Sequence, residues 1–416
     1  MNILDYLAIF TFIYPSAMAT VWICGGIYFY LHWERKQPWP TIHEWHDDAP
    51  PVTVLLPCFN EGRNIEETVK HLFNQNYPNL EIIAINDGST DDTASKLETL
   101  KLSFPQLKVL HQQNNGKANA LNYGLSKANG EIIVGIDGDS VLDYDAIGYM
   151  VEHFRGSPKV SGVTGNPRVR TRSTAIGKIQ TGEFSSIIGL IKRAQRIYGM
   201  VFTISGVVCA FRKSALDAIN GWNTDMVTED IDVSWRLQLN GGQVRYEPRA
   251  LCWVLMPETL RGLFRQRLRW AQGGGEVFLR YFTTSLKWEN RRFWILMFEY
   301  MLSVIWCYSV ILFILTWSMT SLFSDFSYSM AGDFISYFGG ALVAISFIQF
   351  TVSFIIDSRY DKKIFRCAYW CIWYPFVYWI LNMITVVIAF PKAVMRQKGR
   401  NATWESPDRG ELFHEK

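Results

Sequence analysis

The chain has 416 residues, of which 49% are hydrophobic and 15% aromatic, and its formal net charge is +3. So small a basic excess gives no argument for nucleic-acid binding. The seven cysteines include no Cys-x-x-C pair, so we expect neither a disulfide framework nor a zinc site. The length is sufficient for one large domain with additional elements.

The first expected element is a membrane anchor within residues 1–33. Residues 7–31 carry no charge and form a run long enough to cross a hydrocarbon core of about 30 Å. No Lys or Arg precedes the run, and it continues well past the small residues at 16–19, so we interpret it as an uncleaved anchor. Arg35 and Lys36 follow it, and the positive-inside rule then places the central domain in the cytosol.

Residues 48–255 alternate between short apolar runs and helical patterns. This alternation predicts an α/β fold with a mainly parallel sheet and helices on both faces. Ligands of such sheets bind beyond the carboxyl ends of the strands, where polar clusters fall at 58–60, 86–92 and 137–139. Strands are expected at 52–56, 80–85, 107–111 and 131–136, and helices at 64–73, 91–102 and 118–128.

Four charged residues at or near these strand ends are candidates for binding a nucleotide and a metal ion. Asp137 and Asp139 flank Gly138, and carboxylate oxygens suit Mg²⁺ or Mn²⁺, although an isolated Asp-Gly-Asp is equally well a solvated turn. Asp87 could bond a base or ribose. Lys117 lies at an expected helix start, which suits a diphosphate, although a surface lysine is the simpler interpretation of that residue alone.

The segment Thr228-Glu229-Asp230 allows two interpretations from the residues alone. A carboxylate here could accept the proton of an acceptor hydroxyl as a general base. Equally, Thr228 could cap a helix whose first turn carries the two acids.

Residues 256–292 are expected to form amphipathic helices at the membrane interface. Leucine and phenylalanine repeat at helical spacing in 257–273, and a stripe of arginines lies beside them. Gln266, Arg269 and Trp270 have the spacing of one helical face, where Trp can stack on a sugar and Arg can hold phosphate. A membrane-surface helix alone would explain the arginines but not this face.

Residues 293–392 contain three further apolar runs, at 295–320, 334–356 and 367–390. The loop after the first run has no Lys or Arg and is expected outside, and the next loop is basic and expected in the cytosol. The last run is ambiguous, because both of its flanks are basic. Pro375 and Asn382 could permit a broken or re-entrant segment, followed by a basic tail at 393–416.

Taken together, the motifs resemble the processive family 2 glycosyltransferases with a GT-A fold, related to cellulose, hyaluronan and chitin synthases. Their pattern is an early Asp, an Asp-x-Asp, a Thr-Glu-Asp and a Gln-x-x-Arg-Trp. These match Asp87, Asp137 with Asp139, residues 228–230 and residues 266–270, in the same order.

The resemblance implies a role for each matching residue. Asp230 would be the base, accompanied by Thr228 and Glu229, and Asp139 would bind the Mg²⁺ or Mn²⁺ ion. The reaction would be a single displacement with inversion. The implied donor-binding residues are Asn60, Glu61, Asp87, Lys117, Asp137, Gln266, Arg269 and Trp270, and the implied acceptor-binding residues are Ser205, Gly206 and Trp270.

Segments such as 163–168, 203–206, 256–259 and 406–410 resemble a bacterial branch of this family that makes a biofilm exopolysaccharide of β-1,6-linked N-acetylglucosamine. This implies UDP-N-acetylglucosamine as donor, a growing polysaccharide exported through the bilayer, a multi-pass protein of the bacterial inner membrane and a small membrane accessory subunit. Regulation by cyclic di-GMP is linked to Gram-negative relatives. The alternatives are another β-glycan synthase, a polyprenyl-phosphate sugar transferase, or a polysaccharide channel with a degenerate transferase domain.

Overall fold

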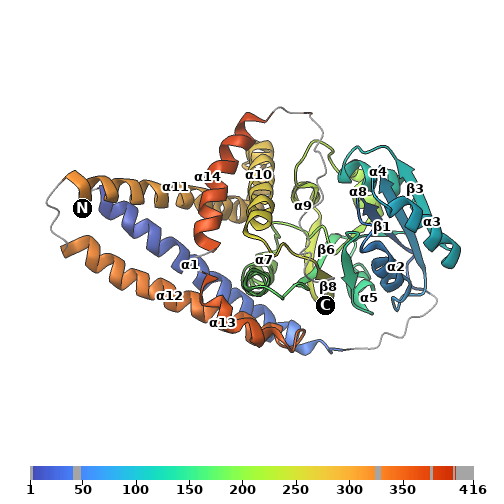
Figure 1. The fold of residues 1–416 in the computed structure, drawn as a ribbon, viewed down its shortest axis with the longest axis horizontal. Helices are drawn as coiled ribbons and strands as arrows, with labels where there is room; N and C mark the ends of the chain where they lie inside the picture. Colours follow the sequence, from blue (N-terminus) through green and yellow to red (C-terminus); the bar gives the residue numbers. More distant parts are fainter. Residues whose placement is uncertain (1–2, 41–47, 324–328, 375–377, 397–398, 400–416) are drawn as a thin grey trace.

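The protein, described here by a computed structural model, consists of an α/β domain and an arm of long helices (Figure 1). The structure describes residues 3–40, 48–323, 329–374, 378–396 and 399. The strands of the described residues form one eight-stranded sheet in the order β3-β2-β1-β4-β7-β6-β8-β5. They are β1 (Val52–Cys58), β2 (Leu80–Asp87), β3 (Leu107–Gln112), β4 (Ile132–Gly135), β5 (Ser140–Leu142), β6 (Val160–Val169), β7 (Cys209–Arg212) and β8 (Gln243–Val254).

The sheet is parallel in its first half and mixed in its second half. β1 pairs in parallel with β2 and β4, and β2 pairs in parallel with β3. β7 is antiparallel to both β4 and β6, β8 is parallel to β6, and β5 is antiparallel to β8. The α/β prediction is thus confirmed, whereas the sheet is less uniformly parallel than expected. The helices between β6 and β7 contact the helical arm, so β7 returns to the sheet without a crossover over its face.

Helices cover both faces of the sheet because successive strand residues point to opposite sides. Val54 and Leu56 of β1 pack in the cluster that contains Val69 of α2, and Leu55 packs in the cluster that contains Leu121 of α4. This two-sided burial explains the near-continuous apolar strands. The helices of the domain are α2 (Ile65–Phe73), α3 (Thr93–Ser103), α4 (Lys117–Lys127), α5 (Ala146–Glu152), α8 (Lys213–Ala218) and α9 (Glu229–Leu239).

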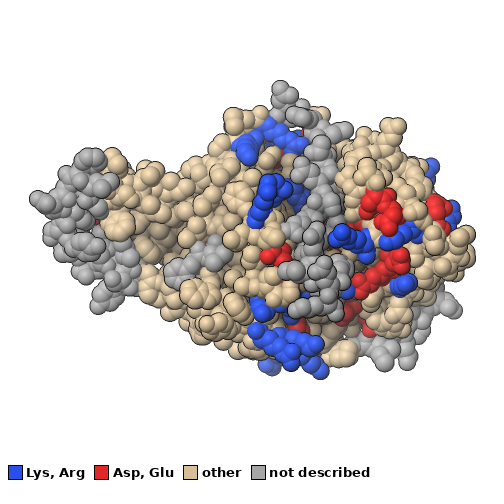
Figure 2. All heavy atoms as spheres, in the orientation of Figure 1, with Lys and Arg blue, Asp and Glu red and all other residues tan. Residues whose placement is uncertain are grey.

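The arm contains helices that are long and apolar enough to cross a membrane. Among the described residues these candidate spans are Asp5–Lys36, Trp288–Met319 and Gly339–Asp357. The visible face of the arm shows almost no charged side chains, and Lys and Arg gather near the end of α1 and α13, where the arm meets the domain (Figure 2). The helices are α1 (Ile3–His32), α11 (Trp294–Phe323) and α12 (Ser329–Asp357).

The last apolar run does not form one continuous helix in its described part. A 3₁₀ turn, η4 (Ile364–Cys367), precedes the short α13 (Ala368–Cys371), and α14 (Ile380–Met395) begins separately. Pro375, which suggested a break, lies outside the described residues, as does the basic tail apart from its first residues and Gly399. α14 packs against α10 (Leu260–Ser285), the helix that carries the Gln-x-x-Arg-Trp motif.

A buried network of charges joins the arm to the domain. Arg193 donates to Glu34 at 2.7 Å and to Asp357 at 2.9 Å, and Arg168 contacts Asp357 at 2.7 Å. All four side chains are almost fully buried. Loss of one member would leave an uncompensated buried charge, so the network fixes how the arm and the sheet meet. Arg193 lies on α7 (Leu190–Tyr198), which follows α6 (Ala175–Glu183) and the π-helical turn η2 (Phe184–Gly189) between β6 and β7. Two 3₁₀ turns complete the described elements: η1 (Glu34–Lys36) follows α1, and η3 (Trp288–Phe293) precedes α11.

Candidate active site

The rim of the site begins where β1 and β2 end beside each other. Asn60, which has a positive φ of 57°, accepts from the Thr90 N–H and donates its own N–H to Ser89. These bonds fasten the two strand ends together. Helix α3 begins at Thr93, directly after Asp92.

Asp87 lies fully buried at the end of β2 and is bonded within the protein. Its carboxylate accepts from Gln112 at 2.7 Å and from the N–H groups of Asn115 and Gly116 at 3.0 and 2.9 Å. Gly116 has a φ of 90°, so the turn before α4 needs glycine. Asp87 therefore fixes the turn that presents Lys117, and its direct contact with a donor stays a prediction.

Asp137, Gly138 and Asp139 follow β4 on the same rim. Thr68 donates to the Gly138 carbonyl at 3.0 Å, and a Cβ on Gly138 would lie 2.7 Å from Cγ of Glu61. Glycine thus lets this loop lie directly against Glu61. Asp139 is only partly buried, and Asp137 has one buried carboxylate oxygen but keeps part of its side chain exposed, so both carboxylates can face a ligand.

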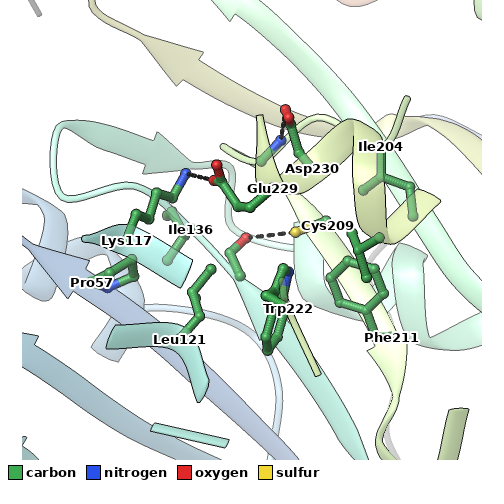
Figure 3. A pocket seen from close by; sticks show the side chains of 13 residues that line it. Pro57, Lys117, Leu121, Ile136, Ile204, Cys209, Phe211, Trp222, Glu229 and Asp230 are labelled. Carbon is green, nitrogen blue, oxygen red and sulfur yellow. Dashed lines mark hydrogen bonds and ion pairs between the residues drawn. The ribbon is translucent and has the colours of Figure 1, made fainter. Parts of the chain in front are cut away.

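Lys117 connects this rim to the beginning of α9. Its Nζ lies 2.7 Å from Asp137. The same Nζ lies 2.9 Å from Glu229 (Figure 3). Burial raises the pKa of Glu229, but Lys117 outweighs this effect, so the pKa of the Glu229 carboxyl falls below its usual value. Burial and the nearby Asp139 raise the pKa of Asp137 despite Lys117. Lys117 and the two carboxyl groups thus form one ion-paired bridge between two distant parts of the sequence.

Asp230 lies next to this bridge in a different electrostatic setting. Burial, followed by the charge of Glu229, raises the pKa of Asp230 to about 6. The Gly206 N–H donates to Asp230 Oδ2 at 3.4 Å, and the N–H of Ile231 donates to Oδ1 at 2.9 Å. A carboxylate of raised basicity that is held by backbone donors suits a general base.

Apolar side chains line the cavity beneath Lys117, Glu229 and Asp230. Figure 3 shows Leu121, Phe211 and Trp222 below the charged groups. This lining excludes water from one side of the carboxylates, which is the physical cause of the raised pKa of Asp230.

Thr228 precedes α9 but does not cap it through its side chain. Among the described residues its hydroxyl has no hydrogen-bond partner, which corrects the capping interpretation, although the acids do fall in the first turn of α9. Helix α10 approaches here so closely that a Cβ on Gly273 would lie 2.2 Å from Thr228 Oγ1. The Thr-Glu-Asp segment and the α10 helix therefore meet at this contact.

The residues of α10 differ in their relation to the acids. The charge of Arg269 reaches Glu229 and Asp230 and favours both carboxylates, although burial and Glu229 still raise the pKa of Asp230. Gln266 accepts from Arg267 at 2.6 Å, and Trp270 lies under the Arg267 guanidinium at 4.1 Å. Arg267 is buried and pairs with Glu183 on α6 at 2.5 Å. Sequence reasoning missed Arg267 as the residue that anchors the helix.

The loop with Ser205 and Gly206 rests on a buried lysine that sequence reasoning also missed. Lys192 on α7 donates to Ser205 Oγ at 2.6 Å and to Thr164 Oγ1 at 3.0 Å. Burial lowers the pKa of Lys192 to about 7. Its sequence neighbours give no signal for this role, because Thr164 lies 28 residues away.

The mixed sheet, the aspartates at its strand ends and the acids at the start of α9 define a glycosyltransferase of the GT-A fold. A mannosyltransferase of Pyrobaculum calidifontis, solved in complex with GDP-Man and Mn²⁺, shares this fold with a TM-score of 0.61 at 20% identity, covering 86% of this chain and all of that one. Residues 50–273 match the family model "Glycosyltransferase like family 2", and the chain belongs to this family.

Two curated relatives align with almost the whole chain. Over 407 residues it is 44% identical to the poly-beta-1,6-N-acetyl-D-glucosamine synthase of Staphylococcus epidermidis, covering 97% of this chain and 98% of that protein. The synthase of the same name from Staphylococcus aureus (strain COL) is 46% identical, covering 96% and 98%.

Proposed function

We propose that the chain is a membrane-embedded, processive, inverting transferase that polymerises N-acetylglucosamine from UDP-N-acetylglucosamine into a β-1,6-linked exopolysaccharide and exports it through its helical arm. The observation that carries this proposal is identity of 44–46% to synthases of that name along 96–97% of the chain, helical arm included. The bridge of Asp137, Lys117 and Glu229 beside Asp230 supplies the chemical groups that such a transfer needs.

The donor is assigned to the rim formed by the strand ends. Asn60 and Glu61 line the place for the uridine, and Asp137 contacts the ribose. Lys117 is available for the diphosphate, to which it would move from its carboxylate partners. Asp87 supports the donor through the turn that carries Lys117.

The residues at the end of β4 fit a hard divalent cation. Asp139 is a partly exposed carboxylate beside Asp137, and oxygen ligands of this kind suit Mg²⁺ or Mn²⁺. Within the described ranges, no group of three or more His, Cys, Asp or Glu side chains could enclose a metal ion, so donor phosphate oxygens would complete the coordination. A bound ion would neutralise the charge that develops on the departing diphosphate.

The acceptor approaches Asp230 from the side of α10. Asp230 takes the proton of the acceptor hydroxyl, the acceptor oxygen forms a bond to the anomeric carbon, and the bond from that carbon to UDP breaks. UDP carries away the bonding electrons, and the configuration inverts. Before the donor binds, Lys117 compensates the charge of Glu229. Thr228 sets the approach of α10. The acceptor is held by Ser205, Gly206 and Trp270, and Gln266 and Arg269 reach the acceptor end and the diphosphate.

The membrane assignment rests on the apolar arm and on the basic ends of its helices. We place the protein as a multi-pass protein of the bacterial cytoplasmic membrane, with the α/β domain on the cytosolic side. The small accessory subunit and the cyclic di-GMP dependence stay predictions of the resemblance.

Membranes that contain the chain, incubated with labelled UDP-N-acetylglucosamine and Mg²⁺ or Mn²⁺, test the proposal. We expect an alkali-stable polymer that a β-1,6-specific N-acetylglucosaminidase degrades, and no polymer when a chelator is present. Polymer resistant to that enzyme would indicate another β-glycan synthase, and lipid-extractable label a polyprenyl-phosphate transferase. Absence of turnover would indicate a channel or binding subunit.

A further inference from the structure

A cleft of about 410 Å³ lies between the end of α1 and the α/β domain, and it includes none of the active-site residues assigned above. Phe29 and Trp33 form its wall on the side of α1. Arg196 of α7 and Arg245 of β8 line it from the domain, together with His153. The cleft thus brings two arginines together at one end of a candidate membrane span.

These two guanidinium groups are unpartnered. Among the described residues neither Arg196 nor Arg245 has a hydrogen bond or an ion pair, and the Nε atom of each is buried. The carboxylate that lines the same cleft, Glu247, is already bound by His153 and by Arg249. Arg196 and Arg245 are only partly buried as whole residues, whereas the buried arginines described above, such as Arg267, each pair with a carboxylate.

Such a pair costs free energy unless something compensates it. Burial, followed by the neighbouring charge of Arg245, lowers the pKa of Arg196 to about 10, and the opposing charge of Glu247, which is itself bound by His153 and Arg249, does not offset them. An anion between the guanidinium groups would satisfy both. Phosphate suits this position, because guanidinium groups bind its oxygens through charge-assisted hydrogen bonds.

The cleft also carries apolar surface that a free phosphate would not use. Trp33 is 48% exposed and Ile197 is 40% exposed, and both line the cleft beside Phe29. Exposed tryptophan at the end of a span is typical of the membrane interface. Arg35 and Lys36 at the same end of α1 indicate the cytosolic side, where anionic headgroups face the protein.

We propose that the Arg196–Arg245 cleft binds the phosphate of an anionic phospholipid from the cytosolic leaflet, with the lipid's apolar part against Phe29, Trp33 and Ile197. The site is separate from the donor rim. It lies on the helix that carries Lys192 one turn before Arg196, so a bound lipid supports the helix beneath the Ser205 loop.

Native mass spectrometry of the purified full-length protein, titrated with phosphatidylglycerol, tests this proposal. The double variant Arg196→Gln/Arg245→Gln should bind the tightest lipid at least about tenfold more weakly than the wild type. The matched control is Arg35→Gln/Lys36→Gln, which removes the same charge from exposed positions at the same end of α1. It should retain that lipid with nearly unchanged affinity. Equal retention by all three proteins would overturn the proposal.

Two further measurements are needed. The first distinguishes a lipid phosphate from free phosphate, and the second distinguishes a loss of lipid binding from a folding defect. Inorganic phosphate alone should not raise the melting temperature of the wild type at concentrations where the lipid does. Selective protection by inorganic phosphate, without a difference in lipid retention, would assign the cleft to a soluble ligand and refute the lipid. Without lipid, the double variant should melt no lower than the wild type, since no protein partner is lost. A lower melting temperature would mean that the arginines are paired within the protein.

Discussion

Substitution of Gly273 by alanine should disable the enzyme through a displacement of α10. The new Cβ would lie 2.2 Å from Oγ1 and 2.3 Å from Cγ2 of Thr228, whereas ordinary contacts begin near 3.4 Å. Both neighbours belong to a β-branched side chain beside the acids, so the helix must retreat by about 1 Å. A misplacement of about 1 Å can cost a reaction about 10²-fold, and we expect a loss of that order in the initial rate of polymer formation.

The adjacent glycine provides the matched control. A Cβ on Gly274 would lie 3.4 Å from the ring of Tyr300, which is an ordinary contact, and alanine favours a helix by up to about 1 kcal/mol over glycine. Gly274→Ala should therefore keep its rate and melt no lower than the wild type. The two variants are compared by labelled polymer formation and thermal unfolding in the same detergent. A Gly273→Ala enzyme with the rate of Gly274→Ala would refute the close contact between α10 and Thr228.

Three further outcomes are expected. The ratio kcat/KM should fall as the pH drops below about 6, because Asp230 must be ionised to accept a proton and its pKa is raised to about 6. A profile that is flat from pH 7 to 5 would argue against this base. Lys192→Met should lower the initial rate roughly 10-fold or more, because it releases Ser205 from its hydrogen bond. The melting temperature should not fall, since the substitution removes a buried charge. An unchanged rate would contradict the positioning role of Lys192. Asp357→Ala should destabilise the protein by about 3–5 kcal/mol because the buried Arg168 loses its carboxylate partner and Arg193 keeps only Glu34, against about 0–1 kcal/mol for the exposed pair member Glu131→Ala. Equal melting temperatures of the two variants would show that the network does not join arm and domain.

The sequence predicts the first half of the sheet and its rim well, because the signals there are local. Apolar runs define β1 to β4, and the polar residues that end them must share one edge of a parallel sheet. Asp87 and Asp137 were therefore expected on one rim. The internal bonding of Asp87 was not expected, because its partners Asn115 and Gly116 lie beyond the next helix and strand.

The features that the sequence could not predict depend on contacts between residues far apart in the chain. Lys117 appears as a surface lysine in its own segment, and only the fold places Glu229 2.9 Å away. Arg193 and Asp357 are 164 residues apart, and neither has a local pattern that distinguishes a buried ion pair from a solvated charge. The antiparallel return of β7 likewise depends on where α6 and α7 pack, which no local periodicity reports.

The most direct test of the site separates the base from the donor rim. In Asp230→Asn and Asp137→Ala, measured in one preparation, the initial rate of polymer formation and the dissociation constant for UDP are compared with the wild type. We predict that Asp230→Asn loses about 10²–10⁴-fold in rate while its UDP affinity stays close to that of the wild type, and that Asp137→Ala loses UDP affinity. Loss of UDP affinity in Asp230→Asn as large as that in Asp137→Ala would contradict the assignment of Asp230 as the base.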